Sequence, residues 1–199
     1  FSLEFKVTPA VLIPRPETEL LVEFALERVS ADRACRVLDL GTGSGCIAVA
    51  IAKHRPRAQV IAVDRSAEAL AVARENASRH ATSNLELRLS DWFAALDEQR
   101  FDLIVANPPY VAKNDPHLNE GDLRFEPAAA LVAGGDGLSS IRSIVATAQR
   151  YLNRDGWLVL EHGYDQAANC RELLREAGFA DVFSRVDIAG IERASGGRS

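Results

Sequence analysis

The chain has 199 residues, of which 47% are hydrophobic and 26% charged, the composition of a folded α/β domain with a sizeable core. No apolar run approaches the roughly 20 residues of a membrane-spanning helix, and the first residues do not read as a secretory signal. The formal net charge of −5 argues against strong nonspecific binding to nucleic acids.

The cysteines are odd in number and widely spaced, and none forms a Cys-x-x-Cys pair. We therefore expect free thiols in a reducing cytoplasm, with neither a zinc site nor a disulfide framework. The histidines also lack the spacing of metal ligands and are expected at the surface or in loops. The residues concerned are Cys35, Cys46, Cys170, His54, His80, His117 and His162.

The predicted elements follow one another in a regular order. Residues 1–16 read as extended and suggest a piece of a longer chain, and apolar spacing then predicts a helix over 17–29. Further helices are predicted over 44–55, 66–80 (with Ser66 as N-cap), 138–152 and 166–178. Strands are predicted over 36–41, 59–64, 84–91, 101–107, 156–163, 180–187 and 192–197.

This alternation of strands and helices predicts an α/β fold with a doubly wound, mostly parallel sheet of seven strands. The last two predicted strands have no helix between them, so we expect an antiparallel last strand. The stretch 111–137 is too long for a simple connection and is predicted to be a lid or a substrate-binding segment.

Three glycines, Gly41, Gly43 and Gly45, follow the first predicted strand directly and precede a helix. Such a turn lets the backbone approach a ligand at the carboxyl end of the sheet, although a tight βα turn alone explains it too. The dinucleotide fingerprint would require glycine at position 46, where this chain has Cys46.

Acidic residues end the next two predicted strands. Asp64 can accept both hydroxyls of a ribose, or it begins the following helix as an N-terminal acid. Asp91 can accept from the exocyclic amine of an adenine and Trp92 can cover its ring, unless Trp92 is a core aromatic. Because no basic group or Walker lysine accompanies the glycines, a nucleoside with an uncharged linker fits better than a nucleotide.

The fourth predicted strand ends abruptly in Asn107, Pro108, Pro109 and Tyr110. The Asn107 side-chain oxygen and the Pro108 carbonyl can accept the two N–H groups of a planar NH₂, and Tyr110 can stack on it. Such a clamp orients a poorly nucleophilic amide nitrogen by positioned acceptors, without a histidine or cysteine nucleophile. The alternative is a loop-entry turn with a buried asparagine.

The motifs DLGTGSG, VDRS, SDWF and NPPY, in this order, resemble those of class I methyltransferases, Rossmann-like enzymes that use S-adenosylmethionine. More narrowly, LIPRPETE, RFEPAAALVAGGDGL, LVLEHG and GIERASGGR resemble the release factor glutamine methyltransferase family over essentially the whole chain. NPPY alone is shared with adenine-N6 and other N-methyltransferases, whereas IPRPETE together with RFEP and GGDGL is much more specific.

The resemblance implies methyl transfer to the side-chain nitrogen (N5) of the glutamine in the GGQ motif of class I peptide chain release factors. It implies that Asp64 binds the ribose of S-adenosylmethionine, that Asp91 and Trp92 lie around its adenine, and that no metal takes part. The turn that lines the cofactor comprises Gly41, Thr42, Gly43, Ser44 and Gly45. The catalytic and substrate-binding stretch comprises Asn107, Pro108, Pro109 and Tyr110, with Asn107 also beside the cofactor.

Members of this family normally carry a helical N-terminal domain that helps to hold the release factor. We therefore expect residues 1–16 to be an extended linker or hairpin remnant after such a domain, and residues 17–199 to be the methyltransferase domain. No membrane and no direct nucleic-acid substrate are expected.

The sequence leaves the roles of several residues and two rival activities open. Arg15, Glu17 and Glu19 either shape the cofactor pocket or begin a helix, where acids suit the helix dipole. Glu161 is either a pocket residue or a solvated strand end. The rival activities are an N-methyltransferase acting on an exocyclic amine of a base (adenine N6 or guanine N2), and a nucleoside-binding module or NAD-dependent enzyme.

Overall fold

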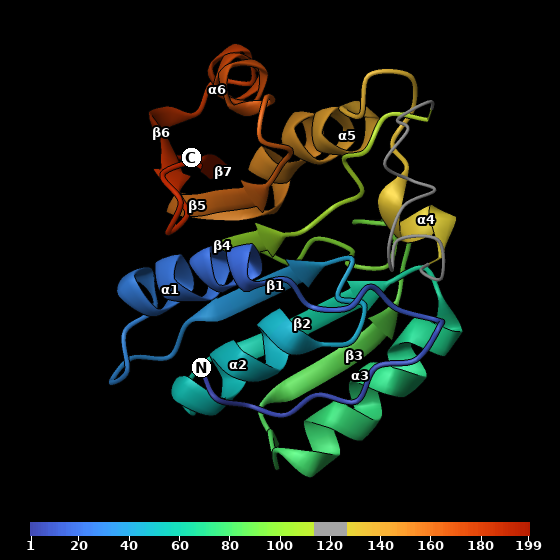
Figure 1. Ribbon diagram of the computed structural model, residues 1–199. Helices are drawn as coiled ribbons and strands as arrows, with labels where there is room; N and C mark the ends of the chain where they lie inside the picture. The colour runs from blue at the N-terminus through green and yellow to red at the C-terminus, as the bar shows by residue number, and fades with distance from the viewer. Residues whose placement is uncertain (114–126) are drawn as a thin grey trace.

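A computed structural model describes residues 1–113 and 127–199, and in it seven strands form one sheet (Figure 1). The order across the sheet is β3-β2-β1-β4-β5-β7-β6, and β7 runs antiparallel to both of its neighbours. The strands are β1 (Arg36–Leu40), β2 (Gln59–Asp64), β3 (Leu85–Leu89), β4 (Phe101–Ala106), β5 (Leu152–Glu161), β6 (Ala180–Val186) and β7 (Glu192–Arg198).

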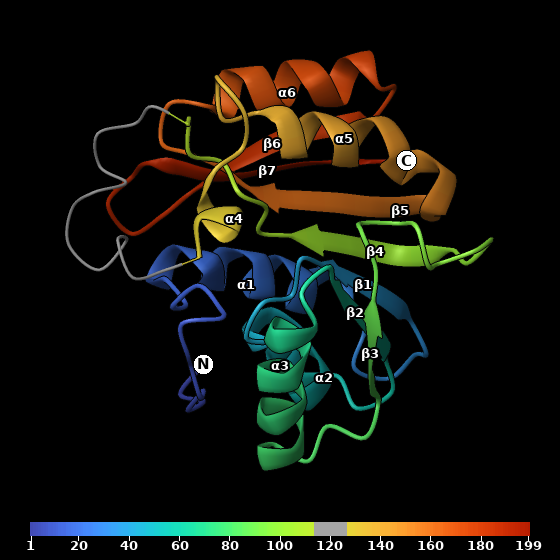
Figure 2. The same ribbon diagram turned by 90° about the vertical axis from the view of Figure 1, so that its right-hand side faces the viewer.

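Helices cover both faces of this sheet (Figure 2). Side chains of α1 and α2 pack in one apolar cluster, and side chains of α5 and α6 pack in another on the opposite face. Because the β1–α2–β2–α3–β3 crossovers run in one direction, α3 lies on the same face as α2. The helices are α1 (Glu19–Arg28), α2 (Cys46–His54), α3 (Ala67–Arg79), α4 (Ala128–Leu131), α5 (Ser139–Ala148) and α6 (Ala167–Glu176).

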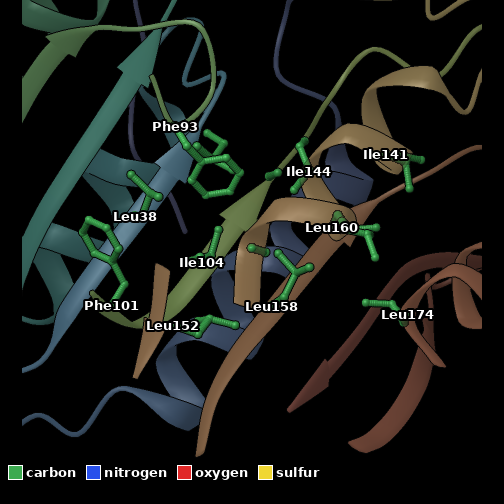
Figure 3. Packing of buried hydrophobic residues seen from close by; sticks show 14 of the residues in the cluster. Leu38, Phe93, Phe101, Ile104, Ile141, Ile144, Leu152, Leu158, Leu160 and Leu174 are labelled. Carbon is green, nitrogen blue, oxygen red and sulfur yellow. The ribbon is translucent and has the colours of Figure 1, made fainter. Parts of the chain in front are cut away.

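The central strands are buried on both faces, which explains why they read as continuous apolar runs in the sequence. Figure 3 shows Ile141 and Ile144 of α5 beside Ile104 of β4 and Leu160 of β5, all of them fully buried. Each such side chain contributes about 1.5–3 kcal/mol through its removal from water. This packing holds the carboxyl ends of β1 and β4 in place, where the strand order reverses and a ligand crevice is expected.

The predicted fold class is confirmed, including the antiparallel last strand. Some bounds differ from the prediction. β5 begins at Leu152 rather than at 156, because Leu152 already pairs with Phe101 ahead of a register shift. β3 ends at Leu89, so Asp91 and Trp92 lie beyond the strand, in a turn where Trp92 has a φ of +46°.

The stretch 111–137 holds regular structure where its residues are described. It contains α4, and Val111 forms a parallel bridge with Val132. Residues 114–126 of the predicted lid lie outside the described residues, and so does His117.

His162 was expected at the surface or in a loop, and it lies directly after β5, outside any strand, but its side chain is fully buried. Its Nδ1 lies 2.9 Å from the Gly163 carbonyl oxygen and its Nε2 lies 2.8 Å from Ser195 Oγ. Burial lowers the pKa of His162, which favours the neutral imidazole. The ring therefore ties the end of β5 to β7.

Residues 1–15 form no helix or strand and lie along the α3 side of the molecule. The Lys6 backbone N–H donates to Asn76 Oδ1 at 2.8 Å, and Asn76 Nδ2 donates back to the Lys6 carbonyl at 2.9 Å. Val11 packs with Ala69 and Val72 of α3. These contacts hold the segment against α3 of the sheet domain.

Candidate active site

A cavity of about 270 Å³ lies at the carboxyl ends of β1, β2 and β4. Figure 2 shows the arrowheads of β4 and β5 pointing to the side where α4 lies. Most of the predicted site residues line the cavity, namely Gly41, Thr42, Gly43, Ser44, Asp64, Asp91, Trp92, Asn107 and Pro109. Gly45, Pro108 and Tyr110 do not line it.

The glycine turn is held by the neighbouring strand. The backbone N–H groups of Gly41 and Thr42 both donate to the Val63 carbonyl at 2.9 Å. Gly41 has a φ of +71°, and a Cβ at this position would lie 3.4 Å from the Trp92 ring. Glycine therefore suits position 41 for its backbone conformation and for the contact with the indole. A Cβ on Gly43 would meet no atom within 4 Å, so the turn opens into the cavity there.

Gly45 has a different function in the same turn. It is the N-cap of α2 with a φ of +82°, and a Cβ there would lie 3.1 Å from the Ala73 Cβ of α3. Its lack of a side chain lets α2 and α3 approach each other. This glycine shapes the packing behind the turn rather than the surface of the cavity.

Asp64 joins the turn to the start of α3. Its Oδ2 accepts from the Gly43 N–H at 2.9 Å and its Oδ1 accepts from the Ser66 N–H at 2.9 Å. Ser66 caps α3 as predicted, because its hydroxyl accepts from the Ala69 N–H. Each carboxylate oxygen keeps a lone pair that can accept a ligand hydroxyl on the cavity side.

Asp39 was missed by reasoning from the sequence. It lies fully buried on β1, and the Thr42 hydroxyl donates to its Oδ2 at 2.7 Å, while its Oδ1 has no partner among the described residues. Burial raises the pKa of this carboxyl to about 7. An acid within an apolar strand was the available signal, since a buried charge requires a structural or functional reason.

The NPPY stretch lies directly after β4. Asn107 Nδ2 donates to Thr18 Oγ1 at 3.1 Å, and the Tyr110 hydroxyl donates to Glu161 Oε1 at 3.1 Å. The Thr18 hydroxyl in turn donates to Glu161 Oε2 at 2.7 Å. Pro108 is buried and Pro109 faces the cavity. The structure thus links Asn107 and Tyr110 through two residues that the sequence analysis did not connect with them.

The backbone of this stretch is anchored by residues that directly precede α5 and α6. Gln166 Nε2 donates to the Tyr110 carbonyl at 3.0 Å, and Gln166 Oε1 accepts from the Gly163 N–H at 2.9 Å. A Cβ on Gly137 would collide with the Tyr110 carbonyl oxygen. Gly137 therefore allows the segment before α5 to pack directly against the residue that ends NPPY.

Glu161 is not a solvated strand end, because only 2% of its surface is exposed. Burial raises the pKa of its carboxyl to about 7, against the opposing hydrogen bonds from Thr18 and Tyr110. Arg15, Glu17 and Glu19 do not line this cavity, whereas Arg15 and Glu19 line an adjoining one of about 350 Å³. Glu17 lies in a 3₁₀ turn, Pro16–Thr18, and Glu19 is the first residue of α1, which fits acids at a helix start.

Within residues 1–113 and 127–199 no helix is long and apolar enough to cross a membrane. Over the same residues, no three or more His, Cys, Asp and Glu side chains are arranged to hold a metal ion.

The chain matches the family model described as "Methyltransferase small domain" over residues 16–136. It is 59% identical to the release factor glutamine methyltransferase of Burkholderia pseudomallei (strain K96243), an alignment that covers 100% of this chain and 72% of the relative. The chain belongs to the release factor glutamine methyltransferase family.

Solved structures agree with this family. The crystal structure of a release factor-specific protein-(glutamine-N5) methyltransferase from Alicyclobacillus acidocaldarius is 33% identical and has a TM-score of 0.59, with 98% of each chain covered. The catalytic domain of hMettl16 in complex with an RNA hairpin has a TM-score of 0.76 at 18% identity, covering 99% of this chain and 76% of that one. At that identity the likeness concerns the fold alone. As a member of a methyltransferase family, the chain is an S-adenosylmethionine-dependent enzyme.

Proposed function

We propose that this chain transfers the methyl group of S-adenosylmethionine to the side-chain nitrogen N5 of the glutamine in the GGQ motif of class I peptide chain release factors. The observation that carries the proposal is that the glycine turn and Asn107 open onto one cavity in a chain of this family. A cofactor and a planar amide would therefore meet at the same place.

We assign the cofactor to the turn of Gly41, Thr42, Gly43 and Ser44, which Gly45 supports from behind by packing against α3, and to the acids beside it. Asp64 would accept from the ribose hydroxyls, Asp91 from the adenine amine, and Trp92 would cover the adenine ring. The cavity fits this ligand, because it is open over Gly43 and is bordered by carboxylates. When bound, S-adenosylmethionine supplies an electrophilic methyl group.

The substrate amide is assigned to NPPY. Asn107 Oδ1 and the Pro108 carbonyl would accept the two N–H groups, and Tyr110 would limit the space beside the amide plane. These acceptors stabilise the positive charge that develops as the nitrogen forms its bond to the methyl carbon. The bound cofactor would supply the methyl group and its sulfur would keep the electron pair of the broken bond, while the methylated nitrogen would give up one proton to water. No nucleophile from the protein is required for this sequence of events.

The decisive experiment incubates the chain with labelled S-adenosylmethionine and a purified release factor. We expect label on the release factor and none on a variant whose GGQ glutamine is replaced by alanine. The full-length Burkholderia pseudomallei relative, which is longer than this chain, serves as a positive control for the substrate preparation. Equal labelling of the native and alanine forms would refute the proposal.

The rival activity on a nucleic-acid amine is supported by NPPY alone. The net charge of −5 disfavours it, and the similarity to the RNA-bound hMettl16 domain concerns the fold alone. Label on DNA or RNA but not on the release factor would establish this rival instead. Calorimetry with NAD and with S-adenosylhomocysteine distinguishes the methyltransferase from an NAD-dependent enzyme. The NAD-dependent alternative requires tight binding of NAD and no binding of S-adenosylhomocysteine.

We further propose that the enzyme acts in the cytoplasm, where its protein substrate is used. Residues 17–199 form the proposed methyltransferase domain. Residues 1–16 form the proposed linker, although Ala10, Val11, Leu12 and Pro14 within it contribute to the wall of the cavity.

A further inference from the structure

Four side chains at the edge of the cavity form one hydrogen-bonded chain. They come from the 3₁₀ turn before α1 (Thr18), from NPPY (Asn107 and Tyr110) and from the last residue of β5 (Glu161). The distances are 3.1 Å from Asn107 Nδ2 to Thr18 Oγ1 and 2.7 Å from Thr18 Oγ1 to Glu161 Oε2. The Tyr110 hydroxyl lies 3.1 Å from the other carboxyl oxygen of Glu161.

The direction of these hydrogen bonds follows from the donors available. An ionised carboxylate can only accept, and a threonine hydroxyl has a single proton. The Thr18 proton is therefore directed to Glu161, and Thr18 Oγ1 can only accept from Asn107. Its partner on Asn107 must be the NH₂ group, which directs the Asn107 carbonyl oxygen away from Thr18.

We propose that Thr18 and Glu161 are positioning residues that hold the Asn107 amide with its carbonyl oxygen toward the substrate. The inference rests on the proposed function, because an acceptor at Asn107 matters for a substrate that presents an NH₂ group. If the Asn107 amide were flipped, its NH₂ group would face the NH₂ group of the substrate. Two donor groups cannot hydrogen-bond to each other, so the substrate amide would not bind. Glu161 also holds Tyr110, so one buried carboxylate orders both side chains of the clamp.

The charge of Glu161 controls this arrangement. Its surroundings contain the hydroxyls of Thr18 and Tyr110, the carboxylate of Glu17, and Arg193 on β7. Burial outweighs the hydrogen bonds and raises the pKa of the carboxyl to about 7. A protonated Glu161 can donate to Thr18, which releases the Thr18 proton toward Asn107 and permits the flipped amide. The clamp is therefore expected to weaken as the pH falls through that value.

The first experiment uses the protein without any substrate. The Asn107 side-chain amide signal in heteronuclear NMR is assigned as the one lost in Asn107→Asp. We expect it to shift in Thr18→Val and to remain unchanged in Thr82→Val, which removes a buried hydroxyl that bonds to the Ala77 carbonyl near the end of α3. We also expect the signal to titrate with pH in the native protein and not in Glu161→Gln.

The second experiment measures methylation kinetics with a release factor. We expect kcat to fall about 10- to 100-fold in Thr18→Val, while the Kd for S-adenosylhomocysteine changes by less than about 3-fold. Thr18→Ser keeps the hydroxyl and is expected to recover most of the rate. In Glu161→Gln the amide mimics the protonated acid, so kcat is expected to be low and to lose the native decline at lower pH.

Two results would overturn the inference. One is a folded Thr18→Val protein with a native Asn107 signal and a native kcat, and the other is a Glu161→Gln enzyme with the native pH profile. If Thr18→Val does not fold, Glu161→Gln still tests the inference through the NMR titration. A shifted Asn107 signal together with labelling of some other substrate would support the positioning role and refute the proposed function.

Discussion

Asn107 depends on residues that are remote in the sequence. Its amide bonds to Thr18, 89 positions earlier, and Thr18 bonds to Glu161, 143 positions later. An asparagine exposed on a loop would sample several rotamers and both amide orientations. Here a buried carboxylate removes that freedom, so that the acceptor is in place before a substrate binds.

The replacement Asn107→Ala tests whether the Asn107 side chain is part of the clamp. We expect kcat to fall by about 100-fold or more, because one positioned acceptor for the developing charge is lost. The Kd for S-adenosylhomocysteine should change by less than about 3-fold, since the turn and Asp64 remain. Asn169→Ala on the exposed side of α6 is the matched control and should preserve both quantities. An active Asn107→Ala enzyme would refute the clamp.

The N-terminus of α2 shows how one turn serves two purposes. Gly41 and Gly43 face the cavity, whereas Gly45 faces α3, where a Cβ would lie 3.1 Å from Ala73 Cβ and 3.3 Å from Ala73 Cα. Because Ala73 is itself on a rigid helix, it cannot move aside as a flexible side chain could. The spacing of three glycines therefore reflects ligand access and helix packing together.

Gly45→Ala is expected to destabilise the protein more than the same replacement at a glycine that has a similar φ but free space around it. Gly190 is the matched control, with a φ of +78° and no atom within 4 Å of the place that a Cβ would take. We expect a loss of about 2–4 kcal/mol in the free energy of unfolding for Gly45→Ala. Gly190→Ala should lose about 1–2 kcal/mol. Urea denaturation measures both values, and equal losses would contradict the packing role of Gly45.

Across the whole molecule, two buried carboxyls are hydrogen-bonded to threonines that line the cavity, Asp39 to Thr42 and Glu161 to Thr18. Asp39 lies on β1 and Glu161 on β5, with β4 between them, and burial raises the pKa of each to about 7. Between their ordinary values and about 7, the folded protein binds more protons than the unfolded chain. The site thus retains groups that oppose folding at neutral pH, as functional sites often do.

The free energy of unfolding is therefore expected to fall as pH rises from about 4 to about 7. Two kinds of group act in the opposite direction: carboxyls with a lowered pKa, such as Asp136 beside Arg142, near the acidic end of this window, and His162, whose pKa burial lowers from 6.5. Urea denaturation at several pH values measures the slope, and Asp39→Asn should reduce it. An Asp39→Asn protein whose stability depends on pH as steeply as that of the native protein would contradict the raised pKa of Asp39.

The sequence alone determined the order of strands and helices, because buried parallel strands require continuous apolar runs and amphipathic helices require their own period. It also located the glycine turn, Asp64 and NPPY, since each of these is a short local pattern at a strand end. Thr18, Gln166 and the buried state of Glu161 and His162 depended on the tertiary structure. Their roles arise from hydrogen bonds between segments brought together only by the packed sheet, and no local pattern carries that information.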